Sequence, residues 1–391
     1  MRWKLFASKG LLGAQPSGYK ISGLKLILKW ITRAILVALI LAFLAGFIAY
    51  WRSTNDCDHM ATLNVPMKAI RFCEYGSPDV LKFEDVEKPT PTDDQILVRV
   101  RAASLNPLDL TIRGPLLLRP LFGMRKPKDT RLGVDYAGTV EAVGKNVTLF
   151  KPGDEVFGAK NGAVAEYVCA LANRYVILKP ANMTFEQAAS VPVAAITALQ
   201  GLRDKGKIQP GQKVLINGAS GGVGTFAVQI AKSFGTEVTG VCSTRNLDMV
   251  GSIGADHVID YTKEDFTKTG QRYDLIFDLV GNHSFSERRR ILNPNGICVM
   301  AGVGGAGWHD DMGMRLAGEL NAYVRSRFVS QKFIAYIAQL NKADLAILGD
   351  LMQSGKVTPV IDRTYKLNET PDALRYLETG HARGKVVINL E

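Results

Sequence analysis

The most apolar stretch of the chain covers residues 34–51, which hold no charged side chain and are bounded by Arg33 and Arg52. As a helix, eighteen residues extend about 27 Å, close to the thickness of the hydrocarbon core of a bilayer. Tyr50 and Trp51 end the stretch, where aromatic side chains commonly meet the membrane surface. The pattern predicts a single transmembrane helix near the amino terminus.

Two other interpretations fit this stretch less well. A cleaved signal peptide does not agree with a basic region of 33 residues before the run, and no small-residue cleavage pattern closes it. A buried core helix needs a folded partner, and the preceding residues suggest none. We therefore expect a basic tail over residues 1–33, the helix over 34–51 and a polar linker over 52–66.

Beyond the linker, short apolar runs are separated by turns rich in Gly, Pro and Asp, for example at residues 96–102, 134–140 and 155–158. Such punctuation is typical of a partly open β-barrel. A helical pattern over 184–203 follows, and β and α patterns then alternate, as in a doubly wound parallel sheet. The pattern predicts an α/β fold.

The tail of the chain, residues 357–390, returns to β-type runs around one helix expected over 370–378. We therefore expect a first, catalytic domain over 67–185 and a second, cofactor-binding domain over 186–330. Residues 331–391 would then return to the first domain.

The organising stretch of the chain is residues 213–232, which read as a strand, a turn of small residues and a helix. Backbone N–H groups at such a helix start favour a diphosphate. Gly221 would let the backbone approach the phosphates, and Gly224 would let the helix pack on the strand. Ala219 replaces the usual first glycine. The expected contacts are Ala219, Ser220, Gly221, Gly222, Val223 and Gly224.

The residues after the next predicted strand, 237–242, bear on which dinucleotide binds. An acidic side chain there would bind the ribose 2′-hydroxyl and repel a 2′-phosphate. The chain instead has Ser243, Thr244, Arg245 and Asn246, which favours NADPH over NADH. The alternatives are a glycine-rich turn that binds nothing and an Arg245 that is merely solvated.

The net charge of +11 over 391 residues does not indicate a nucleic-acid partner. Residues 1–66 hold eight Lys or Arg and two Asp, so much of the excess belongs to the amino-terminal segment. No recognition motif accompanies it. The five cysteines are scattered without a CxxC pair, so we expect free thiols in a reducing compartment and neither a disulfide framework nor a zinc knuckle.

Six ordered motifs resemble the medium-chain dehydrogenase/reductases, specifically their zinc-independent quinone oxidoreductase branch. They are SLNPLD (104–109), LGVDYAGTVEAVG (132–144), KPGDEVFG (151–158), NGASGGVGTFAVQIAK (217–232), GADHVIDY (254–261) and GHARGKVVI (380–388). The resemblance covers about residues 67–391. It implies a GroES-like barrel domain and a Rossmann domain.

The chain departs from the zinc alcohol dehydrogenases, which place a histidine where it has Val134 and a four-cysteine lobe after the turn at 151–154. Catalytic zinc needs three protein ligands, and the five histidines do not cluster in the sequence. We therefore expect no metal.

The resemblance also implies site residues. Tyr261 would lie beside the 2′-phosphate, opposite Ser243, Arg245 and Asn246. The nicotinamide would be bordered by Thr197, Val280, Gly281 and Gly302. Asn106 and Asp109 are the candidate catalytic residues, although Asp109 reads almost as well as a helix cap. Arg383 and Lys385 would contact phosphate or substrate, or form a solvated basic turn.

The implied activity is hydride transfer from NADPH to quinones or α,β-unsaturated carbonyls, with the Asn106 amide or a backbone N–H stabilising the developing oxyanion and water supplying the proton. A short-chain dehydrogenase is disfavoured, because the only Tyr-x-x-x-Lys pair noted, Tyr175 and Lys179, precedes the glycine turn. A low-turnover NADPH-binding redox sensor or docking module remains the alternative.

Two further questions stay open at this point. Residues 304–328 could form a substrate lid, the edge of a homodimer or a second membrane contact. Seven Lys or Arg precede the apolar stretch, which places the amino terminus in the cytosol and the catalytic part outside. A domain that consumes NADPH is expected in the cytosol, and we favour that side.

Overall fold

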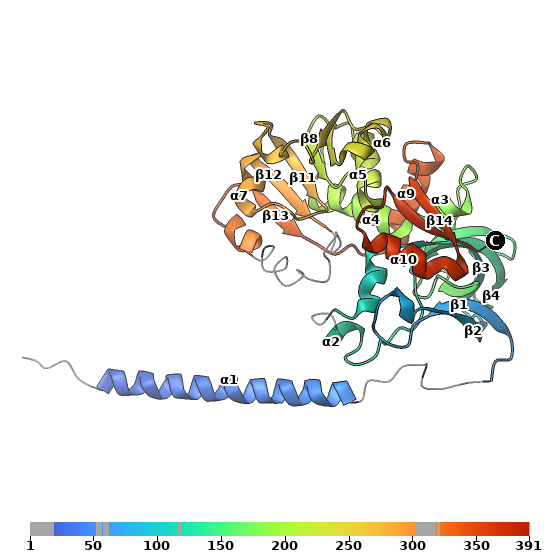
Figure 1. The fold of residues 1–391 in the computed structure, drawn as a ribbon, viewed down its shortest axis with the longest axis horizontal. Coiled ribbons are helices and arrows are strands. Elements are labelled where there is room, and N and C mark those ends of the chain that lie inside the picture. The colour runs from blue at the N-terminus through green and yellow to red at the C-terminus, as the bar shows by residue number, and fades with distance from the viewer. Residues whose placement is uncertain are drawn as a thin grey trace, which may run out of the picture. The chain divides into compact units, whose positions relative to one another are not determined.

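The computed structural model describes residues 19–51, 57, 62–115, 119–301, 318 and 321–390. The chain divides into two units, Met1–Ser53 and Thr54–Glu391. In the first unit, helix α1 (Tyr19–Trp51) has 33 residues (Figure 1). Its stretch Leu26–Ile48 is long and apolar enough to cross a membrane, and its side chains are exposed. The helix thus begins at Tyr19, within the expected basic tail, and includes Lys29 and Arg33.

A six-stranded parallel sheet forms one half of the second unit (Figure 1, yellow to orange). Its order among the described residues is β10-β9-β8-β11-β12-β13, with every pair parallel. This is the doubly wound order 3-2-1-4-5-6 of dinucleotide-binding folds. The strands are β8 (Lys213–Asn217), β9 (Glu237–Cys242), β10 (His257–Asp260), β11 (Tyr273–Asp278), β12 (Leu292–Met300) and β13 (Lys332–Ala335). The last of these lies beyond the expected boundary at residue 330.

Helices accompany these strands as the alternation predicts. The strands are apolar on both faces, as β8 shows with four buried residues in five, because helices cover a parallel sheet on both sides. The helices of this half are α5 (Gly222–Ser233), α6 (Leu247–Ser252), α7 (Phe285–Arg290) and α9 (Lys342–Gln353).

The other half is a mostly antiparallel sheet of β14-β15-β3-β4-β5-β7, with β6 paired to β3. A separate hairpin joins β1 and β2. These strands are β1 (Pro66–Arg71), β2 (Lys82–Glu87), β3 (Gln95–Leu105), β4 (Asp135–Val143), β5 (Glu155–Ala159), β6 (Tyr167–Leu171), β7 (Val176–Leu178), β14 (Ile361–Lys366) and β15 (Lys385–Asn389). The short helices here are α2 (Arg119–Phe122), α3 (Phe185–Ala189) and α10 (Thr370–Glu378).

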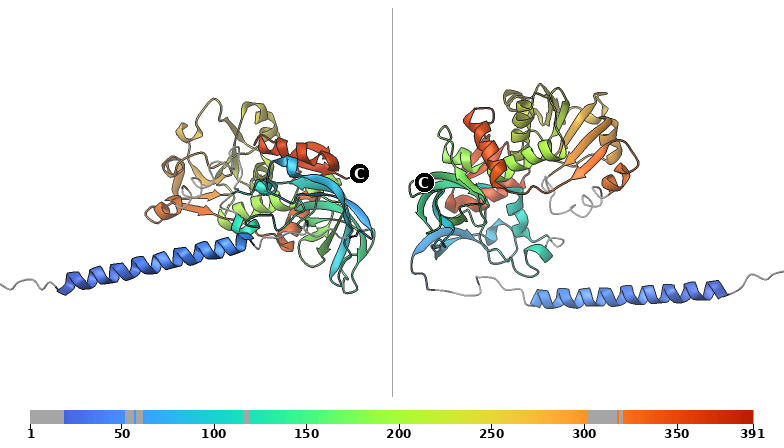
Figure 2. Two further views of the ribbon diagram at one scale, coloured as in Figure 1. Left: turned by 60° about the horizontal axis from the view of Figure 1, so that its bottom comes forward. Right: turned by 180° about the vertical axis from the view of Figure 1, so that it is seen from behind.

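The carboxyl-terminal strands pair with strands from the first part of the unit. β15 pairs antiparallel with β3, from Val386 opposite Leu105 to Asn389 opposite Ala102. Both turned views show the red carboxyl-terminal elements beside the blue-green strands (Figure 2). The return brings residues 380–385 back to the sheet boundary, where the glycine turn also lies.

The helical pattern expected over 184–203 breaks into pieces. α3 ends at Ala189, α4 runs Pro192–Gln200, and a π-helical turn follows at Gly201–Lys205. Val191 keeps helical dihedral angles, but Pro192 has no backbone N–H and cannot continue the hydrogen bonds of α3, which accounts for the first break. α4 is buried along most of its length and packs between the two halves in one shared core.

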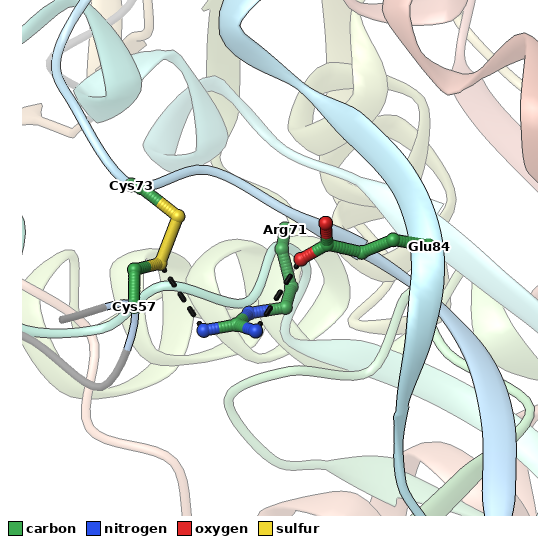
Figure 3. The surroundings of a disulfide bond; sticks show 4 residues. All are labelled: Cys57, Arg71, Cys73 and Glu84. Carbon is green, nitrogen blue, oxygen red and sulfur yellow. Dashed lines mark hydrogen bonds and ion pairs between the residues drawn. A yellow bond between two sulfur atoms is a disulfide. The ribbon is translucent and has the colours of Figure 1, made fainter. Parts of the chain in front are cut away.

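The expectation of free thiols is wrong for two cysteines. Cys57 and Cys73 form a disulfide, with Cα atoms 5.8 Å apart, while Cys169, Cys242 and Cys298 are free. The Arg71 guanidinium donates to the sulfur of Cys57 at 3.1 Å and pairs with Glu84 at 3.3 Å (Figure 3). The two cysteines are separated by 16 residues in the chain, a spacing that matches no known motif. Their pairing is therefore seen in the folded structure and not in the sequence.

Candidate active site

The glycine turn between β8 and α5 has the geometry of an anion-binding helix start. A Cβ at Gly221 would have only the Gly218 carbonyl oxygen within 4 Å, at 3.5 Å, so its outer face is open. A Cβ at Gly224 would lie 2.1 Å from the same oxygen, so this position requires glycine for helix packing. No side chain among the described residues caps α5, which leaves its first N–H groups for an anion.

Other turn residues have structural environments. The Ala219 side chain is fully buried. The Asn246 side chain, also buried, donates to the hydroxyls of Ser220 at 3.0 Å and Ser243 at 3.2 Å. Asn246 therefore ties the turn to the end of β9, and its own Oδ1 has no hydrogen-bond partner among the described residues. Gly222 and Val223 are half-buried at the start of α5.

The residues expected around an adenosine phosphate lie at the carboxyl ends of β9 and β10. Ser243 is half-buried, Arg245 is exposed, and the Tyr261 side chain is half-exposed. The backbone N–H of Tyr261 donates to the Cys242 carbonyl at 3.0 Å, which holds the two strand ends together. Three of the four expected residues therefore share one accessible edge, and only Asn246 turns inward.

The carboxyl-terminal motif lies against this edge. The Arg245 guanidinium donates to the His381 carbonyl at 2.6 Å, and Gly221 and Gly384 form a parallel backbone bridge. Arg383 is exposed, with its backbone N–H bonded to Asp362. The motif thus flanks the glycine turn directly.

The loop after β11 borders the turn from the other side. The Asn217 amide donates to Asp278 Oδ1 at 2.9 Å, and the same oxygen accepts the backbone N–H groups of Val280 and Gly281. Val280 also limits the space at Gly218, where a Cβ would lie 2.9 Å from its Cγ2. Val280 and Gly281, two of the four residues expected beside the nicotinamide, therefore stand at the switch point between β8 and β11, where open α/β sheets bind ligands.

A buried polar cluster lies where β3, β4 and β15 meet. The Lys385 ammonium donates to Asn106 Oδ1 at 2.7 Å, and the Asn106 amide donates to Asp135 Oδ2 at 3.0 Å. Lys385 Nζ and Asp135 Oδ2 are 3.6 Å apart. The Ser104 hydroxyl and the Val193 N–H complete the partners of Asp135. Each of Asn106, Asp135 and Lys385 is at most 3% exposed.

Burial sets the charge balance of this cluster. It raises the pKa of the Asp135 carboxyl, with the Lys385 ammonium opposing the shift. It also lowers the pKa of Lys385, against the favourable field of Asp135 and Asp109. Two carboxyl groups and one ammonium therefore share a region that excludes water.

Asp109 has a structural environment. Its carboxylate accepts the backbone N–H groups of Asn106 at 2.7 Å and Gly133 at 3.1 Å. Burial, followed by the Asp135 charge, raises its pKa to about 6 against those two hydrogen bonds. It caps the 3₁₀ helix Pro107–Arg113 and positions Asn106 through the backbone.

Two expected nicotinamide contacts remain. The Thr197 hydroxyl donates to the Val193 carbonyl at 2.7 Å within α4, and the Thr197 carbonyl accepts the Tyr336 hydroxyl. Burial raises the pKa of Tyr336, so this hydroxyl remains a donor. Gly302, together with most of residues 304–328, lies outside the described residues.

The sequence analysis did not identify Asp135 or the buried state of Lys385. Asp135 follows Val134, and in the sequence this motif indicated only that the histidine of the zinc alcohol dehydrogenases is absent. Lys385 begins a strand, KVVIN, in which the next three residues are apolar, and this was the only signal in the sequence that a lysine here is buried.

Comparisons with known proteins agree with this architecture. The pattern of the zinc-binding dehydrogenases matches residues 253–388, and that of the alcohol dehydrogenase GroES-like domain matches residues 92–181. A 2-methylene-furan-3-one reductase of Solanum lycopersicum is 35% identical over 346 residues, 84% of this chain and 81% of that protein. The mitochondrial NAD(P)H oxidoreductase RTN4IP1 of Mus musculus is 33% identical, covering 87% and 95%.

Among solved structures, the Escherichia coli quinone oxidoreductase complexed with NADPH is similar at a TM-score of 0.68 and 26% identity, covering 83% of this chain and all of that one. Fold and site define a two-domain dinucleotide-binding oxidoreductase. The chain belongs to the medium-chain dehydrogenase/reductase family, and its features fit the zinc-independent quinone oxidoreductase branch.

The matching pattern is that of zinc-binding dehydrogenases, but the residues present here do not fit a zinc ion. Within the described part of the chain, no three His, Cys, Asp or Glu side chains form a group that could hold a metal ion. Val134, at the position of a zinc-ligating histidine in the alcohol dehydrogenases, has no donor atom. We derive no step through a metal.

Proposed function

We propose that this chain is a membrane-anchored reductase that uses NADPH to reduce quinones or α,β-unsaturated carbonyls without a metal. The observation that carries the proposal is the position of the buried Asn106 amide, linked through Lys385 to the segment that pairs with the glycine turn. A hydrogen-bond donor is thereby held next to the expected cofactor site. The relatives named as a furanone reductase and as a quinone oxidoreductase act in the same chemical class.

The residues present fit the cofactor. The open face of Gly221 and the uncapped start of α5 accept a diphosphate. No carboxylate follows β9 to repel a 2′-phosphate, and Ser243, Arg245 and Tyr261 offer hydroxyls and a cation at that edge. We assign NADPH as the preferred dinucleotide on this basis.

NADPH supplies a hydride to an electron-poor carbon of the acceptor. The chain's contribution is to stabilise the negative charge that grows on the conjugated carbonyl oxygen. The Asn106 amide has a second N–H that Asp135 does not use, since an amide group carries two donors. Removing one such donor typically costs about 2.7–4 kcal/mol of transition-state stabilisation. The proton then comes from water.

The test is a steady-state screen in which the purified full chain is offered NADPH or NADH with a panel of quinones and enones. We expect acceptor-dependent NADPH oxidation, a preference for NADPH and a loss of about 100-fold in kcat for Asn106→Ala. No turnover with any acceptor, despite measurable NADPH binding, would favour the low-turnover sensor instead.

Anchoring is the second part of the proposal. Leu26–Ile48 spans 23 residues within α1, about 35 Å of helix, and its large apolar side chains are exposed along the whole length. A row of exposed Leu, Ile and Phe is costly in water and favourable in lipid. Extraction of the full chain from membranes at alkaline pH tests this. A protein anchored by α1 stays in the pellet, whereas a peripheral one is released.

A further inference from the structure

The Lys385 ammonium is the buried cation of the candidate-site cluster, and two side chains contact it. It is 3% exposed and begins β15. It lies 2.7 Å from Asn106 Oδ1 and 3.6 Å from Asp135 Oδ2. Because burying an ion costs several kcal/mol unless it is paired, a role for this lysine should follow from those two partners.

These partners fix the orientation of the Asn106 side chain. Its amide oxygen faces the ammonium and its amide nitrogen faces the Asp135 carboxylate, 3.0 Å away. A flipped amide would place N–H groups against the cation and the oxygen against the anion, so both contacts would become repulsive. The charges therefore keep the donor side of the amide on the side of Asp135.

We propose that Lys385 is a positioning residue that holds the Asn106 amide as hydrogen-bond donor to the carbonyl oxygen of the acceptor. The proposal rests on the reductase function above. A competing role is direct binding of the cofactor's diphosphate, because Lys385 Cδ lies beside the glycine turn, 3.1 Å from where a Cβ of Gly222 would stand. The two roles predict opposite kinetic effects.

The experiment compares Lys385→Met, Asn106→Ala and their double variant in the full chain, with Lys356→Met as control. Lys356 is an exposed lysine after α9. We expect Lys385→Met to lower kcat about 10- to 100-fold, the range found for hydrogen-bond partners that orient the ligands of metal sites. The Kd for NADPH, from the quenching of protein fluorescence, should stay within about threefold.

The double variant gives the sharpest readout. If Lys385 acts through Asn106, Lys385→Met and Asn106→Ala together should cost no more than Asn106→Ala alone. Losses that multiply would overturn the proposal, as would a tenfold rise in the Kd for NADPH with kcat retained, which assigns Lys385 to the diphosphate.

Two controls separate the alternatives. Lys385→Met leaves the buried Asp135 carboxylate without its cation, and this variant could fail to fold. In that case the double variant Asp135→Asn/Lys385→Met, in which both side chains are neutral, takes its place. This double variant should show the same loss of kcat, and unchanged kcat would overturn the proposal. An inactive wild type refutes the reductase function and this inference together, whereas an active wild type with a fully active Lys385→Met refutes the inference alone.

The disulfide carries a second, independent inference, about the side of the membrane. Cys57 follows the end of α1 by six residues, and its partner Cys73 follows β1 (Figure 3). Protein disulfides persist in oxidising compartments and are rare in the cytosol. The excess of Lys and Arg before the apolar stretch also places the amino terminus in the cytosol.

We infer that the unit Thr54–Glu391 faces an oxidising compartment, on the side opposite the cytosol. This reverses the side that the demand for NADPH suggested, and it requires a supply of NADPH there. The inference rests on anchoring by α1, which the membrane extraction tests separately.

The test uses the full chain in sealed vesicles with their cytosolic face outward. We expect an external protease to spare the Thr54–Glu391 unit until detergent is added. We also expect alkylation before reduction to leave two thiols unlabelled that are labelled after reduction, and Cys57→Ser to abolish this gain. Digestion without detergent, or labelling of both thiols before reduction, would overturn the inference.

Discussion

At the scale of single residues, the raised pKa of the Asp109 carboxyl group makes the stability of the fold depend on pH. Burial and the neighbouring Asp135 raise its pKa to about 6, while the two backbone N–H groups and Lys385 oppose that shift. Because the ordinary value is 3.8, the folded state binds more protons than the unfolded state between about pH 4 and 6. The contribution of Asp109 to stability therefore falls as pH rises through this window.

We predict that the stability advantage of the wild type over Asp109→Asn, whose amide does not titrate, is largest near pH 4. This stability difference should shrink by about 2–3 kcal/mol by pH 6.5, because each unit of pKa difference corresponds to about 1.4 kcal/mol. Denaturant unfolding at a series of pH values measures this. A difference that stays constant with pH would contradict the assignment.

Arg245 and Asn246 are neighbours in sequence with different environments. Asn246 is buried between Ser220 and Ser243, whereas Arg245 is exposed. We predict that Arg245→Ala weakens NADPH binding about tenfold with little effect on NADH, since only NADPH carries the 2′-phosphate. Arg290→Ala, an exposed arginine at the end of α7, is the control. Equal weakening of both nucleotides would count against this role.

At the scale of elements, the two glycines of the β8–α5 turn should separate binding from folding. Gly221 has φ near −81° and open space around its missing Cβ, so Ala fits there without strain. We predict that Gly221→Ala keeps the wild-type Tm but weakens NADPH binding at least tenfold, because the methyl group occupies the phosphate approach.

Gly224→Ala should behave in the opposite way. Its Cβ would lie 2.1 Å from the Gly218 carbonyl oxygen, so β8 and α5 must move apart and stability should fall by about 1–3 kcal/mol. Thermal unfolding of both variants, with NADPH titration, measures the contrast. Loss of Tm in Gly221→Ala, or none in Gly224→Ala, would contradict it.

The elements were more predictable from the sequence than their partners were. The β8–α5 turn, α10 and the alternation of β9 to β12 follow from periodicity and glycine placement, which are local. The break between α3 and α4 at Pro192 also has a local cause, but the apolar residues on both sides of it continue the helical pattern, so the sequence predicted one helix. Asp135 and Lys385 are 250 residues apart in the chain, and they come together because β3 pairs with β4 on one side and with β15 on the other.

At the scale of the whole molecule, the chain combines an amino-terminal apolar helix with a reductase unit closed by its own carboxyl terminus. β14 and β15 complete the barrel sheet, and the same return places Lys385 beside Asn106 and Asp135 in the candidate site and Gly384 against the glycine turn. The Cys57–Cys73 disulfide joins the linker to this unit. Such pairing depends on the hairpin of β1 and β2, which sequence spacing does not reveal.

We propose that hydride passes from NADPH to a conjugated acceptor in this unit. The most direct measurement uses NADPH deuterated at C4 of the nicotinamide on the transferred face, with an enone as acceptor and mass analysis of the product. We expect one deuterium at the β-carbon of the saturated ketone, with the proton at the α-carbon taken from water. Consumption of NADPH that leaves no deuterium in the product, with either C4-labelled form, would contradict it.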